Sequence, residues 1–186
     1  IAGTRFESFI GGKGNDFIAG NGNAAETGVV TNGDVDRVDY QYDPSSVLVT
    51  LGAGWARDGW GNTDILRDIN MVRGSNQSDS LFGGNPYNDY FEGFEGMRGD
   101  DIIDGLSGTD RVDYASSTSG VEVNLALGYA LDGWGGRDSL FNIEQARGSD
   151  HNDTLIGDAN TNSFIGGAGN DSAVRGLTSP ARLVGR

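Results

Sequence analysis

The chain has 186 residues, of which 36% are hydrophobic and 32 are glycine, so a thin core repeated along an axis is easier to build than one compact core of bulky side chains. Its net charge of −14 at pH 7 repels nucleic-acid phosphate and anionic lipid, which argues against both as partners. Because the chain contains no cysteine, disulfides and thiol chemistry are excluded, and no apolar run approaches the roughly 18 residues that a membrane span needs.

A repeat of 74 residues organises most of the chain. Residues 36–91 align with residues 110–165 without a gap, and nearly half of the aligned pairs are identical. The start of the chain supplies the tail of a further copy, because residues 8–16 match residues 163–171. Long repeats of this kind predict a stacked, open-ended architecture. The sequence therefore predicts one solenoid domain over 1–174, made of the tail of one long repeat and two copies of the 74-residue unit.

A nine-residue pattern lies inside each long repeat, with glycine at position one, aspartate or asparagine at position six and an apolar residue at position eight. Six glycine-rich residues favour a turn, and three residues with an apolar centre favour a short strand whose inward side chain is position eight. Two such units make one coil, so each turn stacks on the turn two units away. The pattern fits, in chain order, 11–19, 59–67 (less perfectly), 96–104, 105–113, 133–141, 148–156, 157–165 and 166–174.

The segments between the nonapeptides predict longer strands. Val47, Val49 and Leu51 alternate with other residues, as their counterparts 74 positions later do, which is typical of a half-buried strand. We expect these strands to continue the solenoid as longer, irregular coils, and no stretch shows helical periodicity. The last segment, 175–186, carries three arginines and no acidic residue, and could be a basic cap, a partner-binding tail or an unrelated extension.

The nonapeptides resemble the G-G-x-G-x-D-x-U-x repeat, with U apolar, of the RTX (repeats-in-toxin, hemolysin-type) calcium-binding proteins. The best matches are 11–19, 96–113 and 148–174, and the linking segments are similar to those between nonapeptide blocks in long secreted RTX proteins. The resemblance implies an all-β fold, a right-handed parallel β-roll or β-helix solenoid with several calcium ions in the turns.

The residue types also predict calcium without the family name. Position six places a carboxylate at the edge of each turn, and glycines expose backbone carbonyls beside it, which gives the hard oxygen ligands that Ca²⁺ prefers. One such motif is an ordinary turn signal, whereas eight in frame in a chain of this charge favour calcium. Asp153 and Asp171, 18 positions apart, should bracket one ion between successive coils. The candidate ligands are Asp16, Asp36, Asp64, Asp79, Asp101, Asp110, Asp138, Asp153, Asn162, Asp171 and the backbone at Gly14, Gly99, Gly108 and Gly169, with Glu7 and Asn162 either ligating or merely capping a turn.

Calcium binding should be coupled to folding. Calcium sites of extracellular modules have a Kd of about 10⁻⁴ to 10⁻³ M, so a tight one contributes roughly 1.4 kcal/mol at millimolar calcium. Five or six such sites approach the whole stability of a typical domain. We therefore expect a chain that is largely disordered without calcium and folded with it.

No residues of the chain form a recognisable catalytic centre. His151 is the only histidine and has no evident nucleophile partner, and neither a zinc helix motif nor a nucleophile elbow is present. Trp55, Trp60 and Trp134 lie near two D-G-W-G turns, where they could bind carbohydrate or another protein, or instead shield the edge of the core.

The predicted role is a non-catalytic structural or adhesion module. The resemblance implies a bacterial protein, secreted or at the cell surface, that leaves the cell by type I secretion. Two alternatives stay open: the accessory calcium module of a secreted enzyme acting on polysaccharide, protein or lipid, and a subunit docked in a larger assembly.

Overall fold

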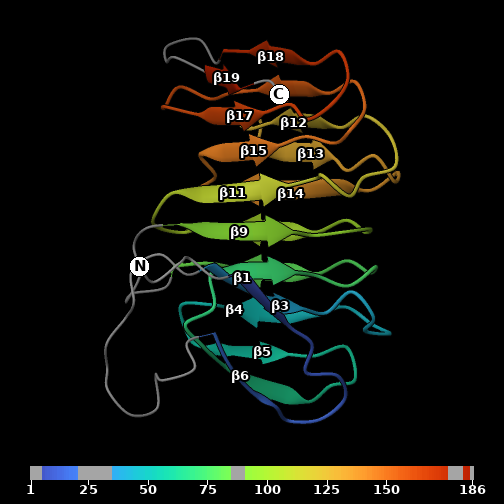
Figure 1. Ribbon diagram of the computed structural model, residues 1–186, viewed down its shortest axis with the longest axis vertical. Helices are drawn as coiled ribbons and strands as arrows, with labels where there is room; N and C mark the ends of the chain where they lie inside the picture. Colours follow the sequence, from blue (N-terminus) through green and yellow to red (C-terminus); the bar gives the residue numbers. More distant parts are fainter. Residues whose placement is uncertain (1–5, 21–34, 85–90, 176–181, 185–186) are drawn as a thin grey trace.

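The computed structural model describes residues 6–20, 35–84 and 91–175, together with the backbone of 182–184. Within these residues every regular element is a β-strand, so the predicted all-β class is confirmed. The strands are short and lie across the long axis of the molecule, stacked one above another (Figure 1). No helix of the described residues is long and apolar enough to cross a membrane.

The strands form two sheets, and the first has eight strands, all paired in parallel. In spatial order its strands are β1 (Phe6–Phe9), β3 (Val35–Asp39), β7 (Met71–Arg73), β9 (Glu92–Glu95), β11 (Asp110–Asp113), β15 (Gln145–Arg147), β17 (Ser163–Ile165) and β19 (Arg182–Val184). The last strand belongs to the basic segment 175–186, of which 176–181 and 185–186 lie outside the described residues.

The second sheet has eleven strands and mixed pairing. Its strands are, in spatial order, β18 (Ser172–Val174), β16 (Thr154–Ile156), β12 (Glu122–Asn124), β13 (Tyr129–Leu131), β14 (Arg137–Phe141), β10 (Ile102–Asp104), β8 (Ser80–Phe82), β4 (Leu48–Thr50), β5 (Trp55–Arg57), β6 (Thr63–Arg67) and β2 (Phe17–Ala19).

The mixed pairing departs from the uniformly parallel solenoid that the sequence predicts. The linking segments form two antiparallel meanders, β4–β5–β6 and β12–β13–β14, instead of irregular coils. Tight turns reverse the chain there, at Gly54 (φ 72°) and Gly128 (φ 67°), because glycine reaches this left-handed region without a Cβ clash. The two meanders are 74 residues apart and so repeat the same departure. The hand of the coil stays a prediction.

The core lies between the two sheets and combines one inward apolar side chain from most strands with buried residues of the connecting segments, such as Tyr40, Ile69 and Tyr114. Position-eight residues of both sheets point between the sheets, and their burial offsets the entropy of ordering many short strands. In the first sheet neighbouring strands align these residues directly, as Val72 with Phe94 and Ala146 with Phe164. The buried position-eight residues are Ile18, Val38, Leu66, Val72, Leu81, Phe94, Ile103, Val112, Leu140, Ala146, Leu155 and Phe164.

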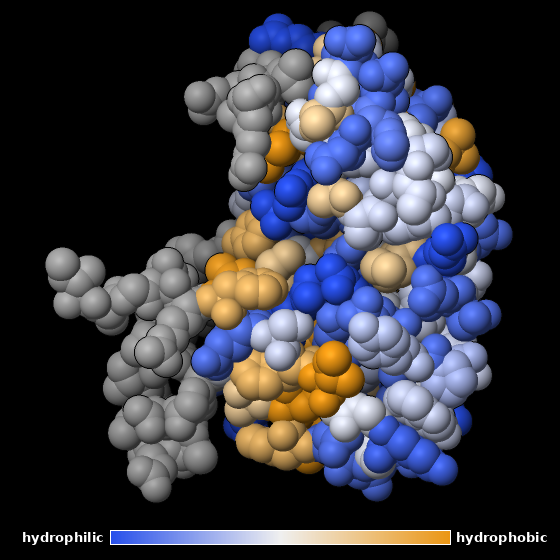
Figure 2. All heavy atoms as spheres, turned by 45° about the vertical axis from the view of Figure 1, so that its right-hand side comes forward, coloured by the Kyte–Doolittle hydropathy of each residue, from blue (hydrophilic) through white to orange (hydrophobic). Residues whose placement is uncertain are grey.

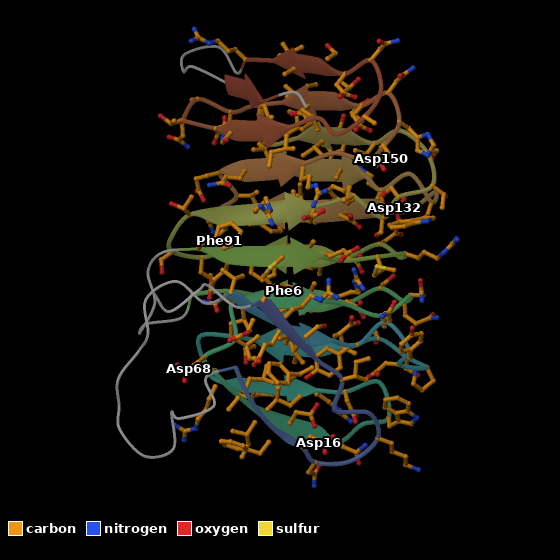
Figure 3. The ribbon with its side chains drawn as sticks, in the orientation of Figure 1. Phe6, Asp16, Asp68, Phe91, Asp132 and Asp150 are labelled. Carbon is orange, nitrogen blue, oxygen red and sulfur yellow. The ribbon has the colours of Figure 1, made fainter. Side chains whose placement is uncertain are left out.

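Turns line the two long edges of this sandwich. We call the edge at which the chain passes from the first sheet to the second the first edge, and the edge of return the second edge. Asp16 and Asp132 lie on the first edge, whereas Asp68 lies on the second (Figure 3). In the space-filling view, hydrophobic residues gather along one side and the opposite side is mainly hydrophilic (Figure 2).

Candidate calcium-binding turns

The position-six residues end the turns and lie at the boundary of the core. Eight of the ten predicted side-chain ligands are buried, and the other two, Asp16 and Asp171, are partly exposed. Strand formation explains the burial, because position six precedes the inward position eight by two residues and points the same way. The buried residues of this set are Asp36, Asp64, Asp79, Asp101, Asp110, Asp138, Asp153 and Asn162.

Adjacent turns on the first edge are joined through these carboxylates. The backbone N–H of Asp79 donates to Oδ1 of Asp101 (2.8 Å), and the N–H of Asp101 donates to Oδ1 of Asp138 (3.0 Å). The N–H of Asp153 donates in the same way to Oδ1 of Asp171 (3.1 Å). The predicted meeting of Asp153 and Asp171 is thus present as a contact between coils, and their sharing of an ion stays a prediction.

The second edge repeats the arrangement with a less regular set of residues. The N–H of Asp36 donates to Oδ1 of Asn70 (3.3 Å), and the N–H of Asp110 donates to Oε2 of Glu144 (2.9 Å). The sequence analysis missed Asn70 and Glu144, because no glycine-rich turn precedes them. Both residues can be recognised as position six from the buried apolar residue two positions later, which is Val72 after Asn70 and Ala146 after Glu144.

Several position-six carboxylates leave one oxygen unsatisfied. Among the described residues, Oδ2 of Asp16, Oδ2 of Asp101 and Oδ1 of Asp110 are buried and accept no hydrogen bond. A buried, unpaired charged oxygen costs at least about 1 to 3 kcal/mol. Such an oxygen is a position at which a cation would stabilise the fold.

Other turns close on themselves through a serine at position two. Ser149 donates its N–H to Oδ2 of Asp153 (2.7 Å) and its hydroxyl to Oδ1 of Asp153 (2.7 Å). Ser75 makes the same two bonds to Asp79, at 2.6 and 2.8 Å. In these closed turns both carboxylate oxygens have partners inside the protein.

The backbone at position two separates the open turns from the closed ones. In the turns of Asp16, Asp101 and Asp110 this residue has a positive φ, and it donates no hydrogen bond to the carboxylate. Two of these residues are not glycine, so their conformation costs of order 1 kcal/mol. They are Met97 (φ 73°) and Leu106 (φ 61°), beside Gly12 (φ 74°).

Glycine at position one allows oxygens to converge. A Cβ built on Gly105 would lie 2.3 Å from the carbonyl oxygen of Asn142 and 2.4 Å from Oδ2 of Asp110. Any side chain would displace these oxygens. The predicted turn glycines all have the positive φ of the nonapeptide turn, and ligation through their carbonyls stays a prediction: Gly14 (146°), Gly99 (129°), Gly108 (127°) and Gly169 (118°).

Burial and crowding disfavour the charged form of the unpaired carboxylates. Burial first, and then the neighbouring carboxylate of Asp138, raise the pKa of Asp101 to about 9. Burial, Glu92 and Glu144 raise the pKa of Asp110 to about 8. Without a cation, the folded chain therefore holds carboxylates that resist ionisation at neutral pH.

Besides Asp79 and Asp153, two further predicted ligands have partners on both oxygens. Asp64 accepts hydrogen bonds from the N–H of Asp16 (2.9 Å) and the hydroxyl of Tyr40 (3.1 Å). Asp138 accepts them from the N–H of Asp101 and the hydroxyl of Tyr114 (2.7 Å). Asn162 uses its Oδ1 to accept the N–H of Asp158 (2.8 Å), so it caps its own turn.

Side chains alone do not build a metal centre in the part of the chain that the structure describes. There, no three His, Cys, Asp or Glu side chains converge closely enough to hold an ion. Calcium takes about six to eight oxygens and accepts backbone carbonyls and water among them. The turns fit calcium only if carbonyl oxygens complete the set, which is what close-packed glycines permit.

The sequence analysis also missed two aspartates that begin the D-G-W-G turns. Oδ1 of Asp58 accepts the N–H groups of Trp60 (3.0 Å) and Asn62 (2.6 Å). Asp132 occupies the equivalent place in the second unit. In the D-G-W-G motif the aspartate at the start organises the turn, so it is a better signal than the tryptophan.

Comparison with known families agrees with this geometry. The model of the RTX calcium-binding nonapeptide repeat matches residues 1–24, 86–116 and 144–173, in four copies. The chain therefore carries RTX-type calcium-binding nonapeptide repeats in these segments, as the nine-residue pattern predicted. No curated protein matches the chain significantly.

Proposed function

We propose that this chain is a non-catalytic structural module of a secreted or cell-surface bacterial protein and that it folds when calcium binds. The RTX repeats support calcium as the ligand. The observation that carries the proposal is the set of buried, unpaired carboxylate oxygens in the open turns. Each is a cost to the metal-free fold that a divalent cation removes.

The open turns would supply the main ligands. Asp16, Asp101 and Asp110 would offer their unpaired oxygens, together with carbonyl oxygens from neighbouring turns. Asp171, which is partly exposed, would be a further ligand. Calcium would cancel the repulsion between stacked carboxylates and contribute no chemistry beyond that. Asp79 and Asp153, closed by serine, would instead hold turns that need no ion, which departs from the shared ion that the sequence predicts between Asp153 and Asp171. Asp36, Asp64, Asp138 and Asn162 would orient the ligands.

Circular dichroism during a calcium titration tests this proposal. The metal-free chain should have little β signal, and the signal should rise cooperatively as calcium approaches the millimolar range. Magnesium at the same concentration is the control, since it demands a smaller, near-octahedral site and gives up its water reluctantly. An equal β signal in chelator and in calcium would refute the proposal.

A groove on the outer face of the first sheet supports a second candidate function, adhesion. It has a volume of about 570 Å³ and is lined by four arginines, Arg37, Arg73, Arg111 and Arg147, with Phe6 and Phe91 beside them. Arg37 and Arg111 stack on these two rings, at 5.5 and 4.9 Å from the ring centroids. The groove thus gathers cations on a chain of net charge −14.

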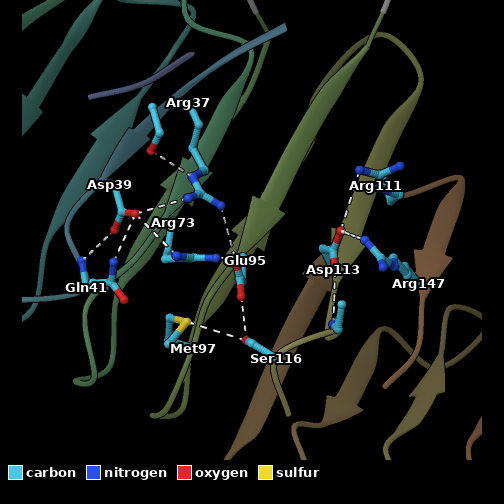
Figure 4. Close-up of polar contacts among 12 residues, drawn as sticks. Arg37, Asp39, Gln41, Arg73, Glu95, Met97, Arg111, Asp113, Ser116 and Arg147 are labelled. Carbon is cyan, nitrogen blue, oxygen red and sulfur yellow. Dashed lines mark hydrogen bonds and ion pairs between the residues drawn. The ribbon is translucent and has the colours of Figure 1, made fainter. Parts of the chain in front are cut away.

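The two ends of the groove differ in how well their arginines are paired (Figure 4). Arg73 contacts Glu95 at 2.7 Å and Asp39 at 3.3 Å. Arg111 and Arg147 share Asp113 alone, at 3.5 and 3.7 Å, and Nε of Arg111 is buried without a partner. This end has guanidinium groups available for a further carboxylate, for which the arginine fork is well shaped.

We therefore propose that the adhesion partner, if this role holds, is an acidic peptide segment of another protein. Apolar contacts from Met71 and Val35 between the arginines suit a peptide better than a bare anion. Binding of a poly-glutamate probe at saturating calcium should weaken about tenfold in Arg147→Ala. The control is Arg57→Ala on the other sheet. Equal binding by both variants and the parent would refute this role.

The three tryptophans support adhesion less well. Trp60 is exposed to 38%, whereas Trp55 and Trp134 are only partly exposed, and the guanidinium of Arg98 lies 5.8 Å from the ring centroid of Trp134. Carbohydrate binding through them, and the role of accessory module to a secreted enzyme, are alternatives to the acidic-peptide proposal.

A further inference from the structure

The loop 132–136, between β13 and β14, holds an aspartate with one saturated and one unsaturated oxygen. Oδ1 of Asp132 accepts three backbone N–H groups, from Trp134 (2.8 Å), Gly135 (2.9 Å) and Gly136 (2.8 Å). Oδ2 of Asp132 is buried and accepts none, although the residue is 0% exposed. The loop therefore holds this carboxylate in one orientation and leaves its Oδ2 buried without a hydrogen-bond donor.

That oxygen lies close to the carbonyl oxygen of Gly99, in the turn 96–101. A Cβ built on Gly136 would lie 2.0 Å from the carbonyl oxygen of Gly99 and 2.7 Å from Oδ2 of Asp132. The two oxygens are therefore less than about 5 Å apart, a separation that one calcium ion can bridge, since its bonds to oxygen measure about 2.3 to 2.6 Å. Asp101, two residues after Gly99, also has a buried Oδ2 without a partner, and its carboxyl lies near enough to Asp132 for that charge to contribute to its raised pKa.

Two hydrogen bonds clamp the loop onto the turn. The N–H of Arg137 donates to Oδ1 of Asp100 (2.8 Å), and the N–H of Asp101 donates to Oδ1 of Asp138 (3.0 Å). The bare oxygens are thus held at a fixed place on the first edge, where Figure 3 shows Asp132. Rigid placement lowers the cost of assembling an ion site.

The equivalent loop of the first unit, 58–62, is closed. Oδ2 of Asp58 accepts the side-chain amide of Asn62 at 2.9 Å. The residue 74 positions later is Gly136, which has no side chain to offer. The difference at this one position therefore leaves Oδ2 of Asp132 without a partner, whereas Oδ2 of Asp58 has one.

We propose that the loop 132–136 and the turn 96–101 form a calcium site between them, with Oδ2 of Asp132, Oδ2 of Asp101 and the carbonyl of Gly99 as ligands. Water would complete the coordination. The site rests on the proposed calcium function and extends it, because the loop lies outside the segments that the family model matches and Asp132 precedes the nine-residue pattern of 133–141. The loop 58–62 forms no such site.

Calcium stoichiometry tests this site in the full chain. Equilibrium dialysis with calcium alone should give one ion fewer for Asp132→Asn than for the parent. The new amide can donate to the carbonyl of Gly99, so the variant is expected to fold. Asp58→Asn is the matched control and should bind as many ions as the parent. An unchanged count in Asp132→Asn, or the loss of an ion in Asp58→Asn, would overturn the site, whereas a parent that binds no calcium would overturn the proposed function itself.

Terbium provides a second readout that does not depend on the stability of an aspartate variant. Tb³⁺ bound in the loop should emit on excitation of Trp134, because energy transfer requires a nearby indole. Trp134→Phe should remove most of this emission, and Trp60→Phe should remove little. Emission that survives in Trp134→Phe and disappears in Trp60→Phe would place the ion at the other loop and overturn the assignment.

Discussion

Two neighbouring turns on the first edge, 74–79 and 96–101, share one nine-residue pattern and solve the burial of its aspartate differently. Asp79 and Asp101 are each 1% exposed. Asp79 accepts the N–H and hydroxyl of Ser75 and the N–H of Val47 (2.8 Å). Asp101 accepts the N–H of Asp79 on one oxygen and nothing on the other.

The difference teaches that equal burial does not mean equal need for an ion. Burial raises the pKa of both carboxyls, but hydrogen bonds to the charged form hold that of Asp79 to about 6, against about 9 for Asp101. Two differences contribute: Asp138 lies beside Asp101 and raises its pKa further, whereas Asp79 accepts hydrogen bonds from Val47 and from the residue at position two. Ser75 donates twice, whereas Met97, at a φ of 73°, donates nothing to Asp101.

The largest expected effect is on the metal-free fold as pH changes. The pKa values of Asp101 (about 9) and Asp110 (about 8) are raised above the ordinary value of 3.8, so the folded chain binds these protons more tightly than the unfolded chain does. The stability that protonation confers is therefore complete below about pH 4 and is lost as pH rises through 8 to 9. In chelator, β signal measured by circular dichroism should be stronger at pH 5 than at pH 9.

The double variant Asp101→Asn, Asp110→Asn sharpens this pH test. Both side chains stay neutral at every pH, so the variant should lose most of the dependence between pH 7 and 9. If its pH profile in chelator matched that of the parent, the open turns would not be the source of the instability.

A smaller effect, of about 3 kcal/mol, is expected when a closed turn loses its carboxylate. Asp153→Ala leaves the N–H groups of Val121 and Ser149 buried without an acceptor. Its free energy of unfolding should fall by a similar amount at every calcium concentration. The measurement is denaturant unfolding over a calcium series, in which the slope against ln[Ca²⁺] counts the ions released on unfolding.

Asp101→Asn is the matched variant in the neighbouring class of turn. The slope of its unfolding free energy against ln[Ca²⁺] should be lower than that of the parent by one ion, because the amide has no charged oxygen in place of the unpaired one. If Asp153→Ala lowered the slope as well, serine closure would not keep calcium away from that turn, and the division of the turns into two classes would fail.

The nine-residue period was enough to predict the core and the stacking of the turns. Position eight places a side chain such as Phe94 or Leu155 inside, and position six brings Asp153 to Asp171, because both follow from a strand period of two and a fixed coil length. The candidate ligands were therefore gathered where the pattern placed them, along the two edges.

The pattern could not show which turns are open or where the chain reverses. Whether a turn is closed depends on the backbone angle at position two. Ser149 donates to Asp153, whereas Met97 and Leu106 have a positive φ, against the preference of residues with a side chain, and leave their turns open. The antiparallel meanders depend on single glycines such as Gly128 in a segment whose alternation is the same for parallel and antiparallel strands. Asp132 was missed because its role depends on a loop and a turn brought together by those meanders.

The smallest effect expected is the loss of one hydroxyl from a closed turn. Ser149→Ala keeps the N–H bond to Oδ2 of Asp153 and removes the hydroxyl bond to Oδ1, which still accepts the N–H of Val121. It also removes the hydroxyl oxygen that accepts the N–H of His151 (3.1 Å). Unfolding free energy at saturating calcium should fall by about 1 kcal/mol, with the calcium slope unchanged. Ser45→Ala, a serine exposed on the same edge, is the control and should change neither quantity. A steeper calcium slope for Ser149→Ala would mean that the hydroxyl excludes an ion from the turn of the parent. Serine at position two would then limit the number of calcium ions that the chain binds, besides stabilising its own turn.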